Sequence, residues 1–494
     1  MKKNNQMIGL LSMIGALSLV LGACGGGGSK AGAKTTEDGK TIIKVVRPTQ
    51  NMASADSKQV KAVQDAINDY IKDKIDVQLD YEEMPAGEYS NKVNLSLANG
   101  EIDLFWTANW MGAISTDDLV QNNGAYDITE ILKGSQLEER LPADVWDASS
   151  YNGKNYFVPV YKEIAEGYSL MFRKELVDQF GWDLSTVKEL KDIEPMLADS
   201  KAAGIKAPLL TQATPFAYKF FLDDYAWITG NDYIGVDREK NEVVEVIKTD
   251  EYVEYIKMMS DWGEKGYIQE GDITNTNPTD SLNTDFWGIS WWTDVPNNAS
   301  ASSRYQQEVE MVHMTQNYVD SNTTLGSTYA IASNTTEEAA KASVDFLGLL
   351  YSDETLANLF TYGIEGEDYD MVDGFIVKKG EKYDHSAWES TNVEFVALEE
   401  GEPANKVELY QEFNKNAEKS ITAGFRFDAS NSSAVISAVN NVVAKYGFVL
   451  QSGGYPQADV DKVLEEYYSA LDEAGYQELV KDVTDQYNAW KTKQ

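Results

Sequence analysis

The chain has 494 residues, of which 42 are basic and 80 are acidic, so its formal net charge at pH 7 is −38. A polyanion of this size repels nucleic-acid phosphates and anionic lipid headgroups, so nucleic acid is not an expected partner. The length exceeds what one hydrophobic core usually holds, and we therefore expect two or more domains.

The N-terminus has the pattern of a secretory signal. Two lysines precede an apolar stretch from about Met7 to Leu21, which is too short and wrongly flanked to be a spanning helix. The residues LGAC that follow resemble a bacterial lipobox, in which Cys24 is lipidated after residues 1–23 are removed. Cys24 is the only cysteine in the sequence, so an exported chain has no intramolecular disulfide and acylation explains this residue best. The alternative is an ordinary signal peptide followed by an unpaired cysteine.

Residues 24–40 are predicted to form a flexible tether. They are rich in Gly, Ser, Lys and Thr and have little apolar content, so they cannot bury enough surface to become ordered. We find no later run that is long and apolar enough to cross a bilayer. The expected molecule is anchored at its N-terminus and soluble beyond it.

The segment after the tether alternates predicted strands and helices. Strands are expected at 41–50, 75–84 and 101–106, with helices from about residue 56 and over 88–100. This β-α-β-α-β order predicts a mostly parallel sheet with right-handed crossovers, and hence an α/β lobe. Ligands of such lobes bind at the carboxyl ends of the strands.

The alternation continues through the rest of the chain, which ends in helices. Residues 156–182 are expected to form strand, turn, strand and helix. The further expected elements are helices over 186–203 and 251–265, strands over 285–297 and 324–333, a helix that Asn334 can cap, and a mostly helical region from about Lys406.

Several motifs in this order resemble family 1 extracellular solute-binding proteins, the lipoprotein receptors of bacterial ABC importers. They are the lipobox with its Gly-rich tether, ANGEIDLFW, YFVPVYKEIAEGYSLMFRKELVDQFG, TYAIASNTTEEAAKASVDFLGLLYSDE and TYGIEGEDYD. The last resembles the G-I-E-G-x-x-Y element of the oligosaccharide-binding, LipO-like members. The tail, which begins GFRFDASNSSAVISAV, resembles the C-terminal domain of unknown function of that subgroup. The resemblance covers essentially the whole chain.

The resemblance implies an α/β fold with two lobes, similar to type II periplasmic binding proteins, in which each lobe has a mostly parallel sheet flanked by helices. The C-terminal region is expected to be helical. The expected boundaries are a signal peptide at 1–23, a tether at 24–40, an N-terminal lobe at 41–160 completed by about 326–375, and a second lobe at 161–325 completed by about 376–494. The chain is expected to cross between lobes near 155–165 and 320–330.

The function implied by the resemblance is capture of a sugar or oligosaccharide between the lobes. Hinge closure encloses the ligand and presents it to the permease subunits of an ABC importer. The implied molecule is a monomer that is held to the extracellular face of a Gram-positive type of membrane by its lipid alone. No cofactor or metal is expected.

Aromatic residues are the first candidates for ligand contact. Sugar rings expose apolar C–H faces and a rim of hydroxyls, which suits aromatic platforms flanked by Asp, Asn, Glu and Arg. The chain has 11 Trp and 28 Tyr, although large aromatics also dominate hydrophobic cores. Trp106, Asn109 and Trp110 lie where the third strand leaves the sheet, at the expected edge of the cleft, so we predict ligand contact there, with core packing as the alternative.

A second aromatic cluster consists of Trp287, Trp291 and Trp292. Neighbouring residues of a strand point to opposite faces, so at most one of Trp291 and Trp292 is expected to reach the cleft. A strand that ends at Trp291 would leave Trp292 in a loop that faces the ligand.

Three charged residues are lesser candidates. Arg47 follows the first strand, and Glu365 lies in the GIEGEDY motif. Arg426 in the GFRFD segment is the weakest of the three, because a surface salt bridge explains it about as well.

An enzyme is the main alternative class of protein. His313 and His385 are isolated, and the HExxH, GxSxG, GxxxxGKS and GxGxxG patterns are absent. A glycosidase needs only two carboxylates, which 80 acidic residues leave open, but the order of elements favours a receptor. A receptor for a peptide or amino-acid-like solute and an adhesive lipoprotein are further alternatives, although adhesins commonly show repeats.

The acidic loops 275–280 and 366–374 lack EF-hand spacing and are expected to be solvated rather than to bind calcium.

Overall fold

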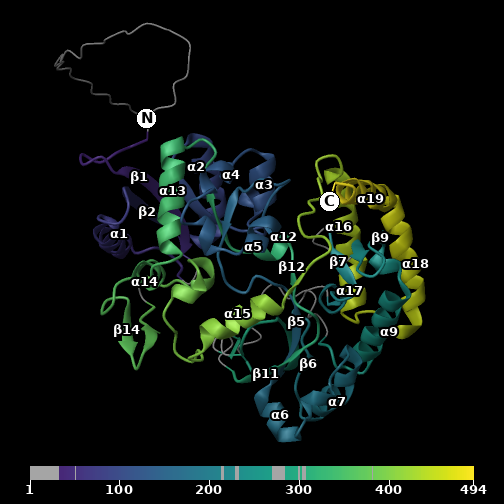
Figure 1. The fold of residues 1–494 in the computed structure, drawn as a ribbon. Helices are drawn as coiled ribbons and strands as arrows, with labels where there is room; N and C mark the ends of the chain where they lie inside the picture. Colours follow the sequence, from purple (N-terminus) through teal and green to yellow (C-terminus); the bar gives the residue numbers. More distant parts are fainter. Residues whose placement is uncertain are drawn as a thin grey trace, which may run out of the picture. The chain divides into compact units, whose positions relative to one another are not determined.

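The computed structural model describes residues 33–49, 52–212, 216–228, 233–269, 284–298, 301–302, 307–380 and 382–493. The expected signal peptide, Cys24 and most of the tether lie outside these residues, as does the acidic loop 275–280. The chain from Ala33 onward forms one compact unit, and this unit contains two large mixed sheets with helices packed around them (Figure 1).

The first sheet begins with the predicted alternation of strands and helices. These elements are β1 (Thr41–Thr49), α1 (Ser57–Ile71), β2 (Val77–Pro85), α2 (Ala86–Asn99) and β3 (Leu104–Thr107). Strand β1 pairs parallel with both β2 and β3. The Asp56 carboxylate accepts the N–H groups of the first turn of α1, and Gly100 ends α2 in a left-handed conformation with φ of 70°. The prediction for this half of the lobe is confirmed.

The other half of the sheet differs from the prediction. Strands β4 (Phe157–Pro159) and β13 (Thr328–Ile331) complete it in the order β2-β1-β3-β13-β4, and β13 pairs antiparallel with both β3 and β4. The sheet is therefore mixed rather than mostly parallel. Because β13 returns from the other lobe and does not follow a βαβ crossover, the rule that favours parallel pairing does not apply to it.

Helices cover this first sheet. The short helices are α3 (Thr116–Gln121), α4 (Thr129–Leu132) and α5 (Ala143–Ala148), and the longer ones are α13 (Glu337–Leu350) and α14 (Glu354–Tyr362). Thr336 caps α13 by accepting the Ala339 N–H, so the expected cap at Asn334 is wrong. Asn334 instead donates to the carbonyl of Leu97 at the end of α2, because the chain between β13 and α13 passes that helix end.

The second lobe contains a four-stranded sheet in the order β11-β5-β10-β6. Strand β5 pairs antiparallel with β10 and β11, and only β10 and β6 are parallel, so this sheet is also mixed. Its strands are β5 (Tyr168–Arg173), β6 (Ala207–Leu209), β10 (Trp287–Thr293) and β11 (Val309–His313). The helices of this region are α6 (Lys174–Phe180), α7 (Glu194–Ala202), α8 (Ala217–Phe220) and α9 (Asp250–Glu264). A small sheet of β7 (Tyr225–Trp227), β8 (Gly235–Asp237) and β9 (Glu242–Val244) was not predicted.

The C-terminal region is helical, as predicted. It contains α15 (Lys406–Asn416), α16 (Ser433–Val442), α17 (Phe448–Gln451), α18 (Gln457–Glu473) and α19 (Tyr476–Lys491). Contrary to the sequence expectation, the helical stretch Ser433–Gln451 is long and apolar enough to cross a membrane by length and composition. Its Val439, Val443 and Leu450 belong to the hydrophobic core of the second lobe, and 22% of its most apolar window is buried, so one side of the helix packs on that lobe.

The chain passes between the lobes at three places. It leaves the first sheet after β4, returns between β12 (Tyr318–Val319) and β13, and crosses again at β16 (Glu418–Lys419), which pairs with β12. Helix α12 (Ser321–Thr324) lies on the second of these crossings. The hairpin of β14 (Tyr369–Val372) and β15 (Phe375–Lys378) precedes a segment whose Tyr383 and Trp388 pack into the first core. The expected boundary at 375 is therefore too early, and residues 376 to about 417 pack with the first lobe.

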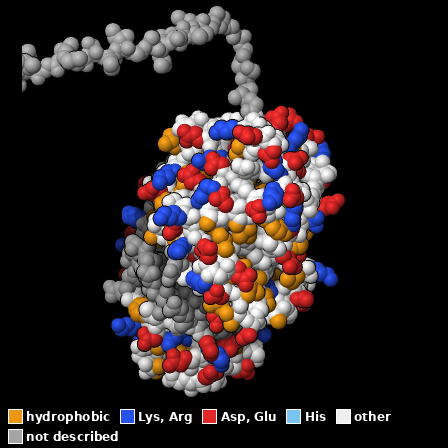
Figure 2. All heavy atoms as spheres, turned by 90° about the vertical axis from the view of Figure 1, so that its left-hand side faces the viewer, with side chains coloured by type: hydrophobic (Ala, Val, Ile, Leu, Met, Phe, Trp, Pro, Cys, Tyr) orange, Lys and Arg blue, Asp and Glu red, His pale blue; other side chains and the backbone are white. Residues whose placement is uncertain are grey.

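Acidic and basic side chains are interspersed on the face of the molecule shown in Figure 2, with hydrophobic side chains between them. Four large hydrophobic side chains are exposed among the described residues, and these are Leu95, Trp110, Met371 and Val372. Of the four, Trp110 also lines the cavity described next.

Candidate ligand-binding cleft

A cavity of about 900 Å³ lies where the two lobes, their connecting segments and the C-terminal region meet. This volume is at the upper end for small-molecule sites. We refer to it as the cleft. The first lobe contributes Asn109, Trp110 and Asp117; the connecting segments contribute Lys162, Glu163, Ala165, Glu166, Asp320, Ser321, Asn322, Thr323 and Gly326; the second lobe contributes Trp227, Ile228, Trp292, Thr293 and Val295; and the C-terminal region contributes Thr422, Phe425, Arg426, Phe427, Ala429 and Ile436.

Trp110 is held in place at the edge of the cleft while 56% of its surface stays exposed. Its indole N–H donates to the carbonyl of Gly326 at 2.9 Å. The ring packs edge-on against Trp106, with 5.7 Å between the ring centroids. A fixed and exposed indole is a platform that needs little ordering when a ligand binds.

Trp106 is fully buried beneath this platform. Its indole N–H donates to the Ser327 hydroxyl at 2.9 Å, and its ring contacts Trp388 at 6.0 Å between centroids. The prediction of direct ligand contact for Trp106 is therefore not supported, because every residue of β3 is buried and Ser327 and Trp388 enclose this side chain.

Asn109 lies beside Trp110 and also lines the cleft. Its side-chain Nδ2 donates to the carbonyl of Asn322 at 3.0 Å, and its backbone N–H donates to Leu325 at 2.9 Å. These bonds tie the loop after β3 to the second crossing. Within the described part of the chain its Oδ1 accepts no hydrogen bond, so this oxygen suits a ligand hydroxyl.

The three tryptophans of the second cluster lie on β10. Trp287 is fully buried in a small core, and Trp292 packs against that core and lines the cleft. Trp291 packs instead on the main core of the second lobe: its N–H donates to Thr211, and its ring contacts Tyr168 and the ammonium of Lys219. The expectation that at most one of Trp291 and Trp292 reaches the cleft agrees with this placement, but β10 continues to Thr293 and does not end at Trp291.

The charged residues of the cleft form two pairs and two further acids. Lys162 and Glu163 form an ion pair at 2.8 Å, and Arg426 lies 4.0 Å from Asp117. Burial raises the pKa values of both Glu166 and Asp320, and the negative charge of Asp320 raises the pKa of Glu166 further. Glu166 accepts the hydroxyl of Tyr168, and the Oδ1 of Asp320 accepts two N–H groups of α12.

Sequence reasoning missed Glu166, Asp320, Trp227 and the aromatic residues of the GFRFD segment. Glu166 and Asp320 lie in the segments expected to connect the lobes, which was the available signal, because such segments line the cleft of a two-lobed receptor. Trp227 lies on a three-residue strand that no periodicity reveals.

Arg47 and Glu365 do not face the cleft. Arg47 is fully buried; its guanidinium donates to the Phe360 carbonyl at 2.8 Å and to the Ser390 hydroxyl at 2.7 Å, and lies over the Phe360 ring. Glu365 is exposed in the turn before β14, outside the cleft. Direct ligand contact is therefore not supported for either residue.

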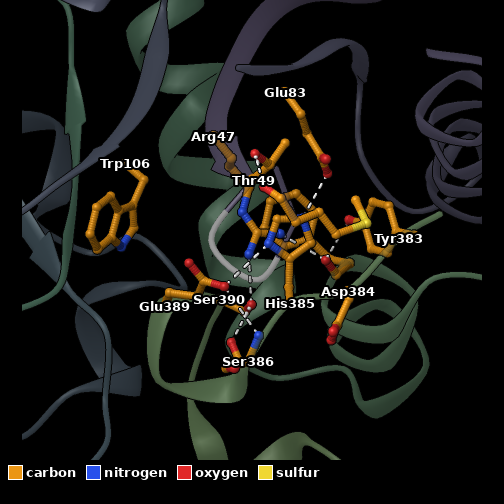
Figure 3. A network of polar contacts seen from close by, with 12 residues as sticks. Arg47, Thr49, Glu83, Trp106, Tyr383, Asp384, His385, Ser386, Glu389 and Ser390 are labelled. Carbon is orange, nitrogen blue, oxygen red and sulfur yellow. Dashed lines mark hydrogen bonds and ion pairs between the residues drawn. The ribbon is translucent and has the colours of Figure 1, made fainter. Parts of the chain in front are cut away.

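Arg47 belongs to a buried cluster with Glu83, His385, Glu389 and Ser390 (Figure 3). The imidazole of His385 lies between two carboxylates, with Nε2 2.7 Å from Glu83 and Nδ1 3.2 Å from Glu389. Both contacts suit an imidazole with a proton on each ring nitrogen, because ionised carboxylates are acceptors. Burial and Arg47 oppose this charge, yet Glu83 and Glu389 outweigh them and hold the pKa of His385 above its ordinary value. No group of three or more potential metal ligands is found among the described residues.

Comparisons with known proteins agree with the two-lobed architecture. The family model described as bacterial extracellular solute-binding protein matches residues 65–364, which is more than half of the chain. The chain therefore belongs to this family of solute-binding proteins. A second model, described as a domain of unknown function, matches residues 421–492.

Individual relatives are similar over nearly the whole chain. A carbohydrate ABC transporter substrate-binding protein of Streptococcus pneumoniae serotype 4 is 26% identical over 96% of each chain. The N-glycan transport solute-binding protein NgtS of Streptococcus pneumoniae is 22% identical, with a TM-score of 0.79 over 92% of this chain and all of that one. The substrate-binding protein FusA of the same species, in complex with kestose, has a TM-score of 0.57 at 11% identity over 92% of this chain and all of FusA. The predicted fold class, an α/β protein with two lobes, is confirmed.

Proposed function

We propose that the chain is the substrate-binding lipoprotein of an ABC importer and that it captures an oligosaccharide between its lobes. The observation that carries this proposal is the pairing of Trp110 on the first lobe with Trp292 on the second, both on one cleft. Indole rings match the apolar C–H faces of sugar rings. The same cleft is lined by Asn109, Glu166 and Asp320, whose oxygens can accept hydrogen bonds from ligand hydroxyls.

The relatives support a carbohydrate over other solutes. The Streptococcus pneumoniae relative is named as a carbohydrate transporter component, and NgtS has been solved with Man1GlcNAc and Man5GlcNAc. A cleft of about 900 Å³ accommodates a ligand of several sugar rings. We therefore assign an oligosaccharide rather than a peptide or an amino-acid-like solute, and a binding rather than a catalytic role.

The mechanism is a shift between open and closed states. A ligand that contacts Trp110 and Trp292 together binds the closed state better than the open state, and only this difference in affinity drives closure. The three connecting segments allow the lobes to move about a hinge. The closed receptor, anchored by the lipid on Cys24 to the extracellular face of the membrane and acting as a monomer, then delivers the sugar to the permease.

A thermal-shift screen with gluco-, manno-, xylo- and galacto-oligosaccharides, together with Man5GlcNAc, tests this proposal. We expect saturable stabilisation by at least one glycan, because a ligand that binds only the folded state raises the melting temperature. Chromatography of the same mixtures should show intact glycans. Release of products would identify an enzyme, and stabilisation by peptides alone would replace the sugar assignment.

A further inference from the structure

The C-terminal segment 421–492 matches a domain of unknown function, and its position in the structure assigns it a role. Resting on the function proposed above, we propose that this segment is a recognition module of the receptor. Its first part forms one wall of the cleft, and its Arg426 contacts the first lobe. We refer to these contacts of Arg426 as the clasp. The module therefore contributes both to ligand affinity and to the relative position of the lobes.

The helices of the segment are fixed to the second lobe. Tyr476 donates its hydroxyl hydrogen to the Tyr233 carbonyl at 2.8 Å, and Tyr468 donates to the Ile247 carbonyl at 2.6 Å. Apolar residues of α16, α18 and α19 belong to the same hydrophobic core as β5 and α9. Any side chain that the segment presents to the cleft is therefore held on a rigid support.

The stretch before α16 and the start of that helix face the cleft. Phe425, Phe427 and Ile436 form an apolar wall there, on the side of the second lobe. Phe425 is anchored from behind by Tyr487 and Trp490, at 5.2 and 5.6 Å between ring centroids, whereas Phe427 is half-buried. An apolar wall opposite hydroxyl acceptors suits the C–H face of a sugar ring or the methyl group of an N-acetyl substituent.

Arg426 connects this wall to the other lobe. Its Nη2 donates to the Ser321 carbonyl at 3.1 Å, and its guanidinium lies 4.3 Å from the centre of the Tyr151 ring. Tyr151 in turn donates its hydroxyl hydrogen to the Asp117 carboxylate at 2.6 Å, and Arg426 lies 4.0 Å from that carboxylate. One side chain thus spans the C-terminal segment, the second crossing and the first lobe.

The guanidinium retains a donor for a ligand. The Nη1 of Arg426 lies 4.0 Å from the Asp117 carboxylate, beyond hydrogen-bond distance, in a residue that lines the cleft. A ligand hydroxyl or carbonyl can accept a hydrogen bond from this group. The same side chain is therefore placed to sense the ligand and to hold the lobes.

Calorimetric titration of matched variants with the glycan that stabilises the wild-type chain most tests the recognition role. Phe427→Ala should weaken binding roughly tenfold or more, the cost of losing a buried phenyl contact. Phe448→Ala is the matched control, because Phe448 is also half-buried in this segment and packs on the same core but does not line the cleft.

Arg426→Lys keeps the charge, loses the planar fork and should weaken binding about fivefold or more. Lys481→Gln, which removes an exposed ion pair of α19, should leave the affinity unchanged.

A second measurement tests the clasp without any ligand. In a cysteine-free background made by Cys24→Ser, spin labels on Glu130→Cys and Lys191→Cys report the distance between the lobes, since both side chains are exposed. Arg426→Lys should broaden or shift this distance distribution, and Lys481→Gln should not.

The possible results separate this inference from the proposed function. If no glycan binds the wild-type chain, the proposed function fails and the recognition role fails with it, while the label distances still decide the clasp. If the wild-type chain binds but Phe427→Ala and Arg426→Lys bind equally well, the recognition role is overturned and the proposed function stands. Identical label distances in Arg426→Lys and the wild-type chain would overturn the clasp.

Discussion

The buried cluster around Arg47 and the cleft around Arg426 are built from the same kinds of residues but differ in their role in the molecule. Each combines an arginine, carboxylates and aromatic rings. In the cluster the charged side chains are sealed from solvent and His385 lies between two carboxylates, although the Nε of Arg47 and the Oε2 atoms of Glu83 and Glu389 have no hydrogen-bond partner among the described residues. In the cleft, which a ligand can enter, the Oδ1 of Asn109 and the Nη1 of Arg426 make no hydrogen bond with the described residues.

This difference shows what separates a structural polar site from a recognition site. The charges of the cluster are out of reach of solvent and ligand, so only other groups of the protein can compensate them. A recognition site instead leaves polar atoms for the ligand to satisfy. Changes in the buried cluster should therefore affect stability and spare affinity, and changes in the cleft should do the reverse.

The largest effect is expected for Arg47→Met. Removal of the guanidinium leaves the Phe360 carbonyl and the Ser390 hydroxyl without their donor and the buried carboxylates with less positive charge around them, which should cost about 3–5 kcal/mol of unfolding free energy. Urea denaturation measures this loss, with Lys61→Met as the control, since Lys61 forms only an exposed ion pair. Glycan affinity measured well below the unfolding transition should be retained. A stability loss under about 1 kcal/mol would show that the cluster does not hold the lobe together.

Variants of Trp106 and Trp110 test most sharply whether the core determines stability and the cleft determines affinity. Trp106→Ala should lower the unfolding free energy by about 3–5 kcal/mol, because it opens a cavity in the core. Trp110→Ala should change stability by less than about 1 kcal/mol and weaken glycan binding roughly tenfold or more. Denaturation and calorimetry on both variants separate the two effects. A large loss of stability with intact affinity in Trp110→Ala would reassign that residue to the core.

The same pair shows how far sequence reasoning reaches. The periodicity of β1, α1, β2, α2 and β3 predicts these elements because their apolar spacing reflects burial on one side. The sequence places Trp106 at the end of the third strand, where the next residues could lead either into the core or into the cleft. Trp106 is buried by partners far along the chain, among them Ser327 and Trp388, and no local pattern reports them.

The sequence also does not reveal which strands pair, or which side chains contact each other, when the partners lie far apart along the chain. The antiparallel pairing of β13 depends on a return from the other lobe. Sequence reasoning ranks Arg47 above Arg426 as a ligand contact, whereas the structure buries Arg47 away from the cleft and places Arg426 on it. The partners that bury Arg47 lie more than 300 positions away. The resemblance to a family predicts the two lobes correctly, whereas the assignment of individual side chains requires the packed structure.

The pH dependence of stability should report the buried cluster. The pKa of His385 is raised in the folded state from its ordinary value of 6.5. The charged His385 therefore stabilises the folded state fully below about pH 6.5, and this contribution to the unfolding free energy is lost as the pH rises through the folded pKa. Each pKa unit between the unfolded and folded values corresponds to about 1.4 kcal/mol of that contribution. The chain has two histidines, and His313→Gln leaves His385 as the single titrating imidazole, whose pKa can be read by NMR. A pKa of His385 at or below 6.5 would contradict the doubly protonated form.

The smallest effect concerns the pH dependence of binding, which should run in the opposite direction. Burial raises the pKa values of Glu166 and Asp320 in the cleft, so these groups take up protons as the pH falls and then accept hydrogen bonds from ligand hydroxyls less strongly. Calorimetry from about pH 7.5 to about pH 5 should show a loss of affinity of a few-fold in the wild-type chain. Glu166→Gln should flatten this dependence, and Glu130→Gln on the exposed surface of the first lobe should not. An affinity that is constant over this range would mean that the cleft carboxylates do not contact the ligand, and the recognition site would then rest on its aromatic walls and Arg426.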